Sequence, residues 1–143
     1  MSDTAALHPC NCLALRQAAR TVTAMYDRHL EKAGITTSQH SLLAAIAFNP
    51  GIAMQELSEQ MVMDRTTLVR ALKPLSRDGY IQQLPDAANS RKLVFTLTDE
   101  GRQKYAEAHQ HWLRAQAEFD ASFGKTRAEA MRAELIDLAK HQL

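Results

Sequence analysis

Lysines and arginines between residues 65 and 92 are the side chains whose spacing first suggests a chemistry. Six cations stand there against two acids, so this segment carries a net charge of +4, while the whole chain of 143 residues carries +1. A basic patch on a near-neutral protein is an electrostatic footprint suited to a polyanion such as nucleic acid. The alternative is a solvated surface that happens to be basic.

The stretch DRTTLVRALKPLSRDGYI (64–81) is predicted to place several of these cations on one face of a helix. At about 100° per residue, the leucines at 68, 72 and 75 share one face. The opposite face collects Thr66, Arg70, Lys73 and Arg77. Arginine suits bidentate bonds to guanine, and hydroxyl groups reach phosphate. An ordinary amphipathic surface helix is the alternative interpretation.

Pro74 lies inside this predicted helix, where a proline costs about 3 kcal/mol because it removes a backbone N–H and clashes with the preceding turn. On the helical wheel it falls on the flank between the two faces. The carbonyl that it frees belongs to Arg70, on the polar side, where water can bond to it. We therefore expect that the helix tolerates a kink at Pro74, which follows the cations Arg70 and Lys73 and precedes Leu75.

The rest of the chain is predicted to be mostly helical, with one hairpin. Three- and four-residue spacing of hydrophobic residues indicates further helices. Their predicted ranges are about 11–33, 37 or 38 to 49, 54–61, 99–123 and 126–141. Thr37 or Ser38 is suited to cap the second, Asp64 the helix above and Thr98 the helix that begins TDEG. YIQQL (80–84) and KLVFTL (92–97), joined by PDAANSR, read as a β-hairpin.

This order of elements predicts a mostly α (α+β) fold with a winged helix-turn-helix lobe over residues 35–98. The terminal segments, 9–34 and 99–143, carry hydrophobic stripes too long for so small a core to bury. A second copy of the chain would bury them, so we expect a homodimer through these dimerisation helices. At the hairpin tip, Arg91 is a candidate for the minor groove, with Lys92 beside it. The alternative is a surface arginine that caps or pairs with Asp86.

The segment LSEQMVMDRTTLVRALKPLSRDGYI, followed by SRKLVFTLTDEGR, resembles the MarR family of dimeric winged-helix transcriptional regulators. The resemblance implies a single MarR-like domain over residues 1–143 that binds double-stranded DNA at a roughly palindromic operator. The residues expected to contact DNA are Arg65, Thr66, Thr67, Arg70, Lys73, Arg77, Arg91 and Lys92. The chain departs from the family at Asn89, where an aspartate usually orients the wing arginine, and at Ala53, where a threonine usually caps the short helix.

Regulators of this family are commonly released from DNA by small aromatic acids or by cysteine oxidation. The resemblance therefore implies a repressor with a ligand pocket where the lobe meets the dimerisation helices. Candidate lining residues are Arg16, Arg20, Tyr26, His29, His40, Phe48 and Trp112. Plain core or interface packing is the alternative for each of them.

The motif HPCNC places His8, Cys10 and Cys12 within five residues. Thiolates bind soft metals and react with oxidants, so a redox- or metal-sensing regulator is the alternative hypothesis for release. These three groups fall short of a closed four-ligand site unless subunits share it, and the two cysteines are too close for an easy mutual disulfide. Free cysteine is also often a small buried hydrophobe.

Other functional classes have little support in the sequence. There is no glycine-rich phosphate loop, no H-E-x-x-H and no nucleophile elbow, so we expect no enzyme, no catalytic residue and no cofactor or bound metal. A winged helix that binds proteins instead of DNA should lack the ridge of cations. No hydrophobic run approaches the roughly 20 residues that span a bilayer, and a signal peptide is not apparent. We therefore expect a cytoplasmic protein without a membrane partner.

Overall fold

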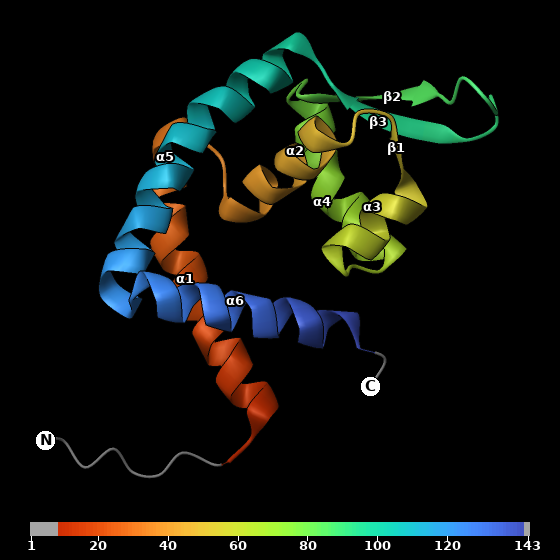
Figure 1. The fold of residues 1–143 in the computed structure, drawn as a ribbon. Helices are drawn as coiled ribbons and strands as arrows, with labels where there is room; N and C mark the ends of the chain where they lie inside the picture. The colour runs from red at the N-terminus through yellow and green to blue at the C-terminus, as the bar shows by residue number, and fades with distance from the viewer. Residues whose placement is uncertain (1–8, 142–143) are drawn as a thin grey trace, which may run out of the picture.

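The computed structural model describes residues 9–141 and is mostly helical, as predicted (Figure 1). Its elements in chain order are α1 (Asn11–Leu30), the 3-10 helix η1 (Glu31–Ala33), α2 (Thr37–Phe48), β1 (Ile52–Ala53), α3 (Met54–Met61), α4 (Arg65–Arg77), β2 (Ile81–Pro85), β3 (Leu93–Leu97), α5 (Asp99–Phe123) and α6 (Lys125–Lys140). Helices α2, α3 and α4 cluster against a small sheet, and the long α5 leads away from it.

One hydrophobic core holds α2, α3, α4 and the sheet together. Its largest fully buried side chains come from α2, α3, α4 and β3 and from the last residue of α1. They are Leu30, Leu42, Leu43, Ile46, Leu57, Leu68, Leu75 and Phe95. The predicted packing of Leu68 and Leu75 toward the preceding helices through Leu57 is confirmed. This core fixes the angle between the two short helices α3 and α4.

The sheet has three antiparallel strands in the order β1-β3-β2. The hairpin of β2 and β3 was expected from the sequence, but β1 was not, because a two-residue strand carries no periodicity of its own. Ile52 pairs with Phe95 across β1 and β3, and Gln83 pairs with Phe95 from the other side. Strand β2 runs on through Pro85, which an edge strand tolerates because an edge residue need not donate to a neighbour.

Four of the six described α-helices begin with a side-chain cap, and α3 and α6 do not. Asp64 caps α4 and Thr98 caps α5, as predicted, and Ala53 gives α3 no side-chain cap. The prediction for α2 was wrong, because Thr36 is its cap instead of Thr37 or Ser38. The Thr36 hydroxyl accepts from the Gln39 N–H at 3.1 Å, and the Gln39 side chain accepts from the Thr36 N–H at 2.9 Å. This reciprocal pair is a capping box.

Helix α4 continues through Pro74 to Arg77. The N–H of Asp78 donates to the Pro74 carbonyl at 2.9 Å, and the N–H of Tyr80 donates to the Leu75 carbonyl, also at 2.9 Å. Gly79 then takes a φ of 78°, a left-handed conformation that ends the helix. Proline is therefore accommodated within the helix, and the glycine terminates it.

The start of α5 is bonded tightly to the end of α4. Thr98 donates its N–H to the Tyr80 carbonyl at 3.0 Å, and its hydroxyl donates to the Gly79 carbonyl. Gly101 sits directly over this contact, since a Cβ built there would lie 1.9 Å from the Tyr80 carbonyl oxygen. We call these four residues the α4–α5 joint. A side chain at position 101 would force it apart.

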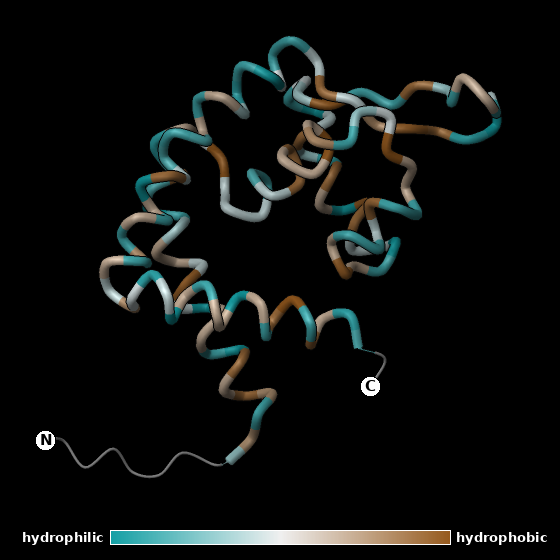
Figure 2. Tube along the Cα trace, in the orientation of Figure 1, coloured by the Kyte–Doolittle hydropathy of each residue, from teal (hydrophilic) through white to brown (hydrophobic). Residues whose placement is uncertain are grey.

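Helices α1, α5 and α6 extend beyond this core, although α1 contributes Leu30 to it and α5 contributes Ala108 (Figure 1). The Glu118 carboxylate links α5 to α1 through His29 at 2.5 Å and Arg28 at 3.7 Å. Helix α6 crosses α1, and its hydrophobic and hydrophilic residues alternate along the tube in Figure 2. Ala128 is the one buried residue of α6, all of which the structure describes. None of the helices within residues 9–141 is both long and hydrophobic enough to cross a membrane.

Candidate nucleic-acid interface

Helices α3 and α4 meet through a tight turn at residues 62–64. Val62 adopts a φ of 52° and a ψ of 48°, a left-handed conformation that is strained for a β-branched residue. The turn is held by the Met63 N–H, which donates to the Ser58 carbonyl at 3.0 Å, while Leu57 and Leu68 are fully buried on either side. Burial of these two leucines orients the outer face of α4.

The N-terminus of α4 is set by Asp64. Its carboxylate accepts from the Thr67 N–H at 2.7 Å, and this bond, together with the Thr67 hydroxyl, holds the pKa of Asp64 below its usual value. The negative charge therefore persists at the positive end of the helix dipole, where it is stabilising. The cap leaves Arg65, Thr66 and Thr67 in the exposed first turn.

Helix α4 has two distinct faces. Leu68, Leu72 and Leu75 are buried, whereas Arg70, Lys73 and Arg77 are exposed, as the wheel predicted. Arg77 lies beyond Pro74, and its Nε is 3.4 Å from a carboxylate oxygen of Asp78. Arg70 and Lys73 form no ion pair within residues 9–141, so their charges are available to a partner.

The hairpin tip is closed by bonds that leave the Arg91 side chain exposed. The Asn89 side chain accepts from the Arg91 backbone N–H at 3.1 Å, so it fixes the turn and not the guanidinium. The Asp86 carboxylate accepts from the Ala88 N–H at 3.4 Å. An ion pair between Asp86 and Arg91 is not found in the described part of the chain.

Arg65, Arg91 and Lys92 line one hollow of about 340 Å³ between the start of α4 and the hairpin. The fold thus brings Arg65 together with two cations that follow it by 26 and 27 residues in the sequence. Lys92 Nζ is also 4.0 Å from the Glu56 carboxylate, which limits its freedom. Lys73 lies in a neighbouring hollow of about 210 Å³.

Gln83 was not predicted from the sequence as a candidate for DNA contact. It lines both hollows, because its pairing with Phe95 directs it to the α4 side of the sheet. The alternation of β2 could have revealed that direction, but a lone polar residue on a strand gives no sign of which helix it faces. Its amide can donate and accept, which suits contacts with bases or with the DNA backbone.

His40 and Trp112, two of the seven predicted ligand-pocket residues, belong to an aromatic stack between α2 and α5. The His40 ring lies 5.5 to 5.8 Å from the rings of Tyr105, His109 and Trp112. His40 is buried and its Nε2 has no hydrogen-bond partner in the structure described. Burial, and secondarily His109, lower the pKa of His40 to about 4, so the imidazole is neutral near pH 7.

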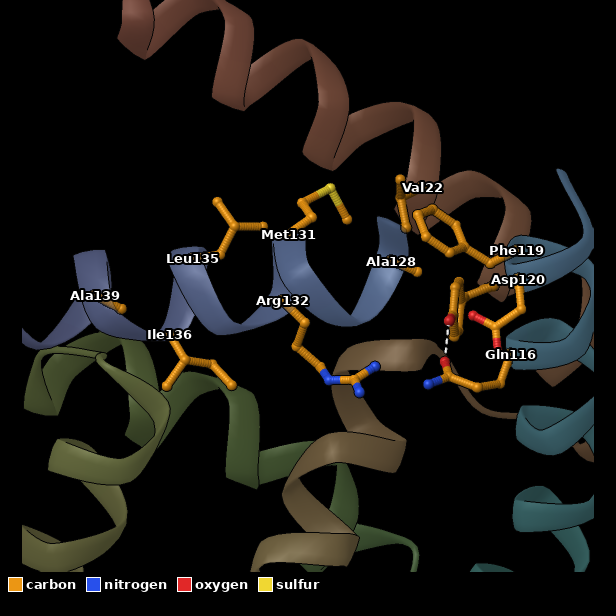
Figure 3. Close-up of a pocket in the computed structure, with 11 residues that line it drawn as sticks. Val22, Gln116, Phe119, Asp120, Ala128, Met131, Arg132, Leu135, Ile136 and Ala139 are labelled. Carbon is orange, nitrogen blue, oxygen red and sulfur yellow. Dashed lines mark hydrogen bonds between the residues drawn. The ribbon is translucent and has the colours of Figure 1, made fainter. Parts of the chain in front are cut away.

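The other five predicted pocket residues lie elsewhere. Tyr26 lines the hollow of Figure 3, where its hydroxyl donates to the Gln116 side chain, and His29 bonds to Glu118. Arg16 and Arg20 are exposed on α1. Phe48 was expected to line a pocket, but its side chain is 77% exposed because Leu42, Leu43 and Ile46 already fill the inner face of α2. Within residues 9–141, the seven do not surround one cavity.

The cysteines lie at the start of α1. The Cys10 sulfur caps the helix by accepting from the Leu13 N–H at 3.4 Å, and Cys12 is exposed. His8 lies outside the described residues, and no group of three metal-binding side chains is found within them. Cys10 thus has a structural role as a cap, which the sequence did not reveal.

Comparisons with known proteins agree with this geometry. A sequence profile of the MarR family matches residues 33–92. The chain is 30% identical over 127 residues to a transcriptional regulatory protein proposed for the hcr operon of Thauera aromatica, a match that covers 89% of this chain and 70% of that protein. It is 34% identical over 87 residues to the HTH-type transcriptional regulator YybA of Bacillus subtilis, covering 61% of this chain and 58% of that protein's length.

A solved structure is similar over almost the whole chain. The transcriptional regulator MosR of M. tuberculosis, crystallised in complex with DNA, shares 34% identity and a TM-score of 0.81, with 92% of this chain and 94% of that chain covered. The match includes α1, α5 and α6 as well as the lobe around α4. The chain therefore belongs to the MarR family of winged-helix transcriptional regulators.

Proposed function

We propose that this protein is a sequence-specific DNA-binding repressor that acts in the cytoplasm as a homodimer on a roughly palindromic operator. The observation that carries the proposal is the grouping of Arg65, Arg91 and Lys92 around one hollow, beside the exposed face of Arg70 and Lys73. The similarity to MosR, which was crystallised in complex with DNA, supports DNA binding by this chain.

In this proposal α4 enters the major groove. Arg70 and Lys73 reach base edges, where guanine offers two acceptors, and Thr66 and Thr67 contact phosphate or a thymine methyl. The hairpin carries Arg91 toward the adjacent minor groove, with Lys92 and Arg65 on phosphates. Arg77, paired with Asp78 behind Pro74, has the weakest geometric case of the predicted contacts.

Selection of bound sequences from a random DNA pool, followed by fluorescence anisotropy on the selected site, tests this surface. Arg70→Ala should weaken binding by about 1–3 kcal/mol and relax the preference at one base position. Arg65→Ala should lower the salt slope by about 0.9 if it neutralises one phosphate. Arg114→Ala is the matched control, because Arg114 is also an exposed cation but lies on α5.

Equal losses for the α4 and α5 variants would remove α4 as the reading helix. Failure to select any sequence, with a salt-independent affinity for DNA, would favour the alternative of a winged helix that binds proteins. Either result is separable from misfolding by the circular dichroism and melting temperature of each variant.

Dimerisation is the second part of the proposal, with residues 35–98 as the DNA-binding lobe and residues 9–34 and 99–143 as the dimerisation helices. Helices α1, α5 and α6 frame an open hydrophobic hollow of about 320 Å³. Figure 3 shows Met131 and Leu135 projecting from one side of α6, and Ile136 and Arg132 from the other. Leu135 is 40% and Ile136 50% exposed, which a single subunit leaves unburied.

Light scattering after size-exclusion chromatography tests the dimer. The wild type should have twice the chain mass of 16.0 kDa. Leu135→Asp should yield monomers and lose operator binding, because a charge would replace buried hydrophobic surface at the interface. Leu84→Asp, at a residue 41% exposed on the hairpin, is the control and should remain dimeric. A monomeric wild type would contradict this part of the proposal.

Release from DNA by oxidation is one mode of regulation in this proposal. The position of Cys10 as the cap of α1 favours it. Peroxide converts a thiolate to sulfenic acid, which would disturb the cap and the helix behind it. Cys10→Ser keeps a capping group but removes the thiol chemistry, so it separates sensing from structure. Peroxide should release the wild type and Cys12→Ser from DNA but not Cys10→Ser; equal release of all three would exclude a sensor at Cys10.

Release by a small phenolic or aromatic acid is the remaining mode. The seven residues expected to hold such an effector do not share a cavity within one chain, so their assignment as its binding site has little geometric support. Screening acids for their effect on DNA anisotropy would test whether an effector exists.

A further inference from the structure

We propose that Glu56 is a positioning residue for the hairpin tip (residues 86–92), and that it raises the preference of this protein for its operator over other DNA. Glu56 lies in the first turn of α3, and one of its carboxylate oxygens is 4.0 Å from the Lys92 Nζ. This contact joins α3 to the hairpin that carries Arg91. The inference rests on the proposed DNA-binding function and adds a residue that determines its specificity.

Glu56 is the one acid that pairs with a cation of the hairpin tip within residues 9–141. Two polar side chains of the tip itself accept local backbone hydrogen bonds instead. The Asp86 carboxylate accepts from the Ala88 N–H at 3.4 Å, and the Asn89 side chain accepts from the Arg91 N–H at 3.1 Å. Asn89 also brings no charge, so the electrostatic attraction that orients the tip comes from α3.

Lys92 is the residue through which the tip is held. Its backbone N–H donates to the Asn89 carbonyl at 2.9 Å, and its carbonyl accepts from the Asp86 N–H at 2.8 Å. Lys92 therefore closes the turn of the tip from both sides. A restraint on its side chain acts on the whole turn, and Arg91 belongs to that turn because its own N–H is bonded to Asn89.

The pair should matter for binding more than for stability. The side chains of Glu56 and Lys92 are 63% and 49% exposed, so water and salt screen their attraction, and such pairs add little to the free energy of unfolding. In DNA binding, a tip that is ordered in advance avoids part of the entropy cost of association. The Lys92 ammonium has three N–H donors, so it can bond to a phosphate while Glu56 remains on its other side.

The negative charge of Glu56 should act differently on the operator and on unrelated DNA. Arg65, Arg91 and Lys92 line the hollow beside α4, and there is no acid among the described residues that line it. Any duplex that lies across these cations brings phosphates near Glu56, and like charges repel. On the operator, entry of the ordered Arg91 into the minor groove offsets this repulsion. Unrelated DNA is bound mainly through phosphates and lacks this compensation.

Backbone amide NMR relaxation of the full chain tests the positioning without any DNA. Glu56→Gln keeps the shape of the side chain and removes its charge. We expect the order parameters of the Asn89, Arg91 and Lys92 amides to fall in Glu56→Gln and to fall equally in Lys92→Met. Glu59→Gln is the matched control, because Glu59 is also an exposed acid of α3 but bonds to Gln55 at 2.9 Å; it should leave the tip unchanged.

Fluorescence anisotropy on the selected operator and on a scrambled duplex of the same length tests the specificity. Glu56→Gln should bind the scrambled duplex more tightly than the wild type does, and the operator no more tightly. The ratio of the two affinities should therefore fall about two- to fivefold, the range expected for one exposed ion pair. Glu59→Gln has the same change in net charge and should keep the ratio. In a Lys92→Met background, Glu56→Gln should not lower the ratio further, because the pair is already broken.

Two results would overturn the inference. One is unchanged order of the tip amides in folded Glu56→Gln. The other is a tightening of both duplexes by the same factor in that variant, which would reduce Glu56 to a source of general repulsion. A wild type without preference for any duplex would instead contradict the proposed function, and the order of the tip amides would then still decide whether Glu56 positions the tip.

Discussion

The lobe of residues 35–98 and the helices α1, α5 and α6 differ in where their hydrophobic side chains lie. In the lobe, Leu42, Leu43, Ile46, Leu57 and Leu68 are fully buried. On α6, three hydrophobic residues are 40–50% exposed. These are Leu135, Ile136 and Leu138. The lobe is therefore built on a buried core, to which Leu30 and Ala108 also contribute, while α6 leaves hydrophobic surface uncovered in the single chain.

This difference separates two sources of stability. An isolated helix of about 12–15 residues is marginal in water, and tertiary packing supplies most of its stability. Lobe stability should accordingly be independent of protein concentration, whereas order in α6 should rise with it if a second copy covers the helix. Five substitutions, each compared with a control or with one another, test how far the two regions act independently.

The largest effect is expected at the α4–α5 joint, where the two regions meet. Gly101→Ala places a methyl group 1.9 Å from the Tyr80 carbonyl oxygen, and a backbone group cannot rotate away. We expect a loss of about 3 kcal/mol or more in the free energy of unfolding, measured by urea titration. Ala117→Gly, at an exposed α5 position, should cost only about 0.5–1 kcal/mol. Similar losses in both would show that the joint is loosely packed.

Two leucine truncations should behave differently in the two regions. Leu57→Ala removes a fully buried side chain from the lobe and should destabilise it by about 2–5 kcal/mol at every protein concentration. Leu135→Ala, at a residue 40% exposed on α6, should have an effect that changes with protein concentration. Melting curves over a hundredfold range of concentration would distinguish them, and parallel behaviour would contradict the comparison.

His40, between α2 and α5, should make stability depend on pH. Its pKa is about 4 in the folded protein and 6.5 when unperturbed, so the unfolded chain binds the proton more tightly. Stability from this group is complete above pH 6.5 and falls as the pH drops toward 4, by about 2 kcal/mol at pH 5. His40→Phe should flatten this part of the urea midpoint profile between pH 7 and 5; His141→Asn, at an exposed histidine, should not.

The smallest effect is expected at Val62, inside the lobe. Its φ of 52° is strained for a β-branched residue, and its side chain is 67% exposed. Val62→Gly removes the strain but adds freedom to the unfolded chain, so we expect a gain of about 0.5–1 kcal/mol. Val69→Gly, at an exposed position within α4, should lose about as much. A loss at both positions would mean that the Val62 side chain packs usefully.

Sequence reasoning succeeded where the determining chemistry is local. The faces of α4, the caps Asp64 and Thr98 and the break at Gly79 all depend on residues within one or two turns. The cap of α2 was misplaced because residues 36–38 all carry hydroxyl groups. The choice of Thr36 depends on Gln39 and on Asp27, whose carboxylate accepts from the Thr37 N–H at 2.7 Å.

Features that depend on distant residues could not be read from the sequence. Strand β1 exists because Ile52 meets Phe95, 43 positions away. The hollow beside Arg65 requires the hairpin to fold back over α4. The helical periodicity places the hydrophobic residue Phe48 on a helix. It does not show that the Phe48 side of α2 stays exposed in the folded chain.

The α4–α5 joint has a mechanical consequence. Helix α5 has 25 residues, so it extends about 37 Å from its cap at Thr98. A rotation of about 5° at one end of such a rod moves the other end by about 3 Å, close to the ~3.4 Å rise of one DNA base pair. If α5 pivots stiffly at Thr98, a tilt too small to disturb the packing at one end becomes, at the other, a displacement on the scale of a single step along the double helix.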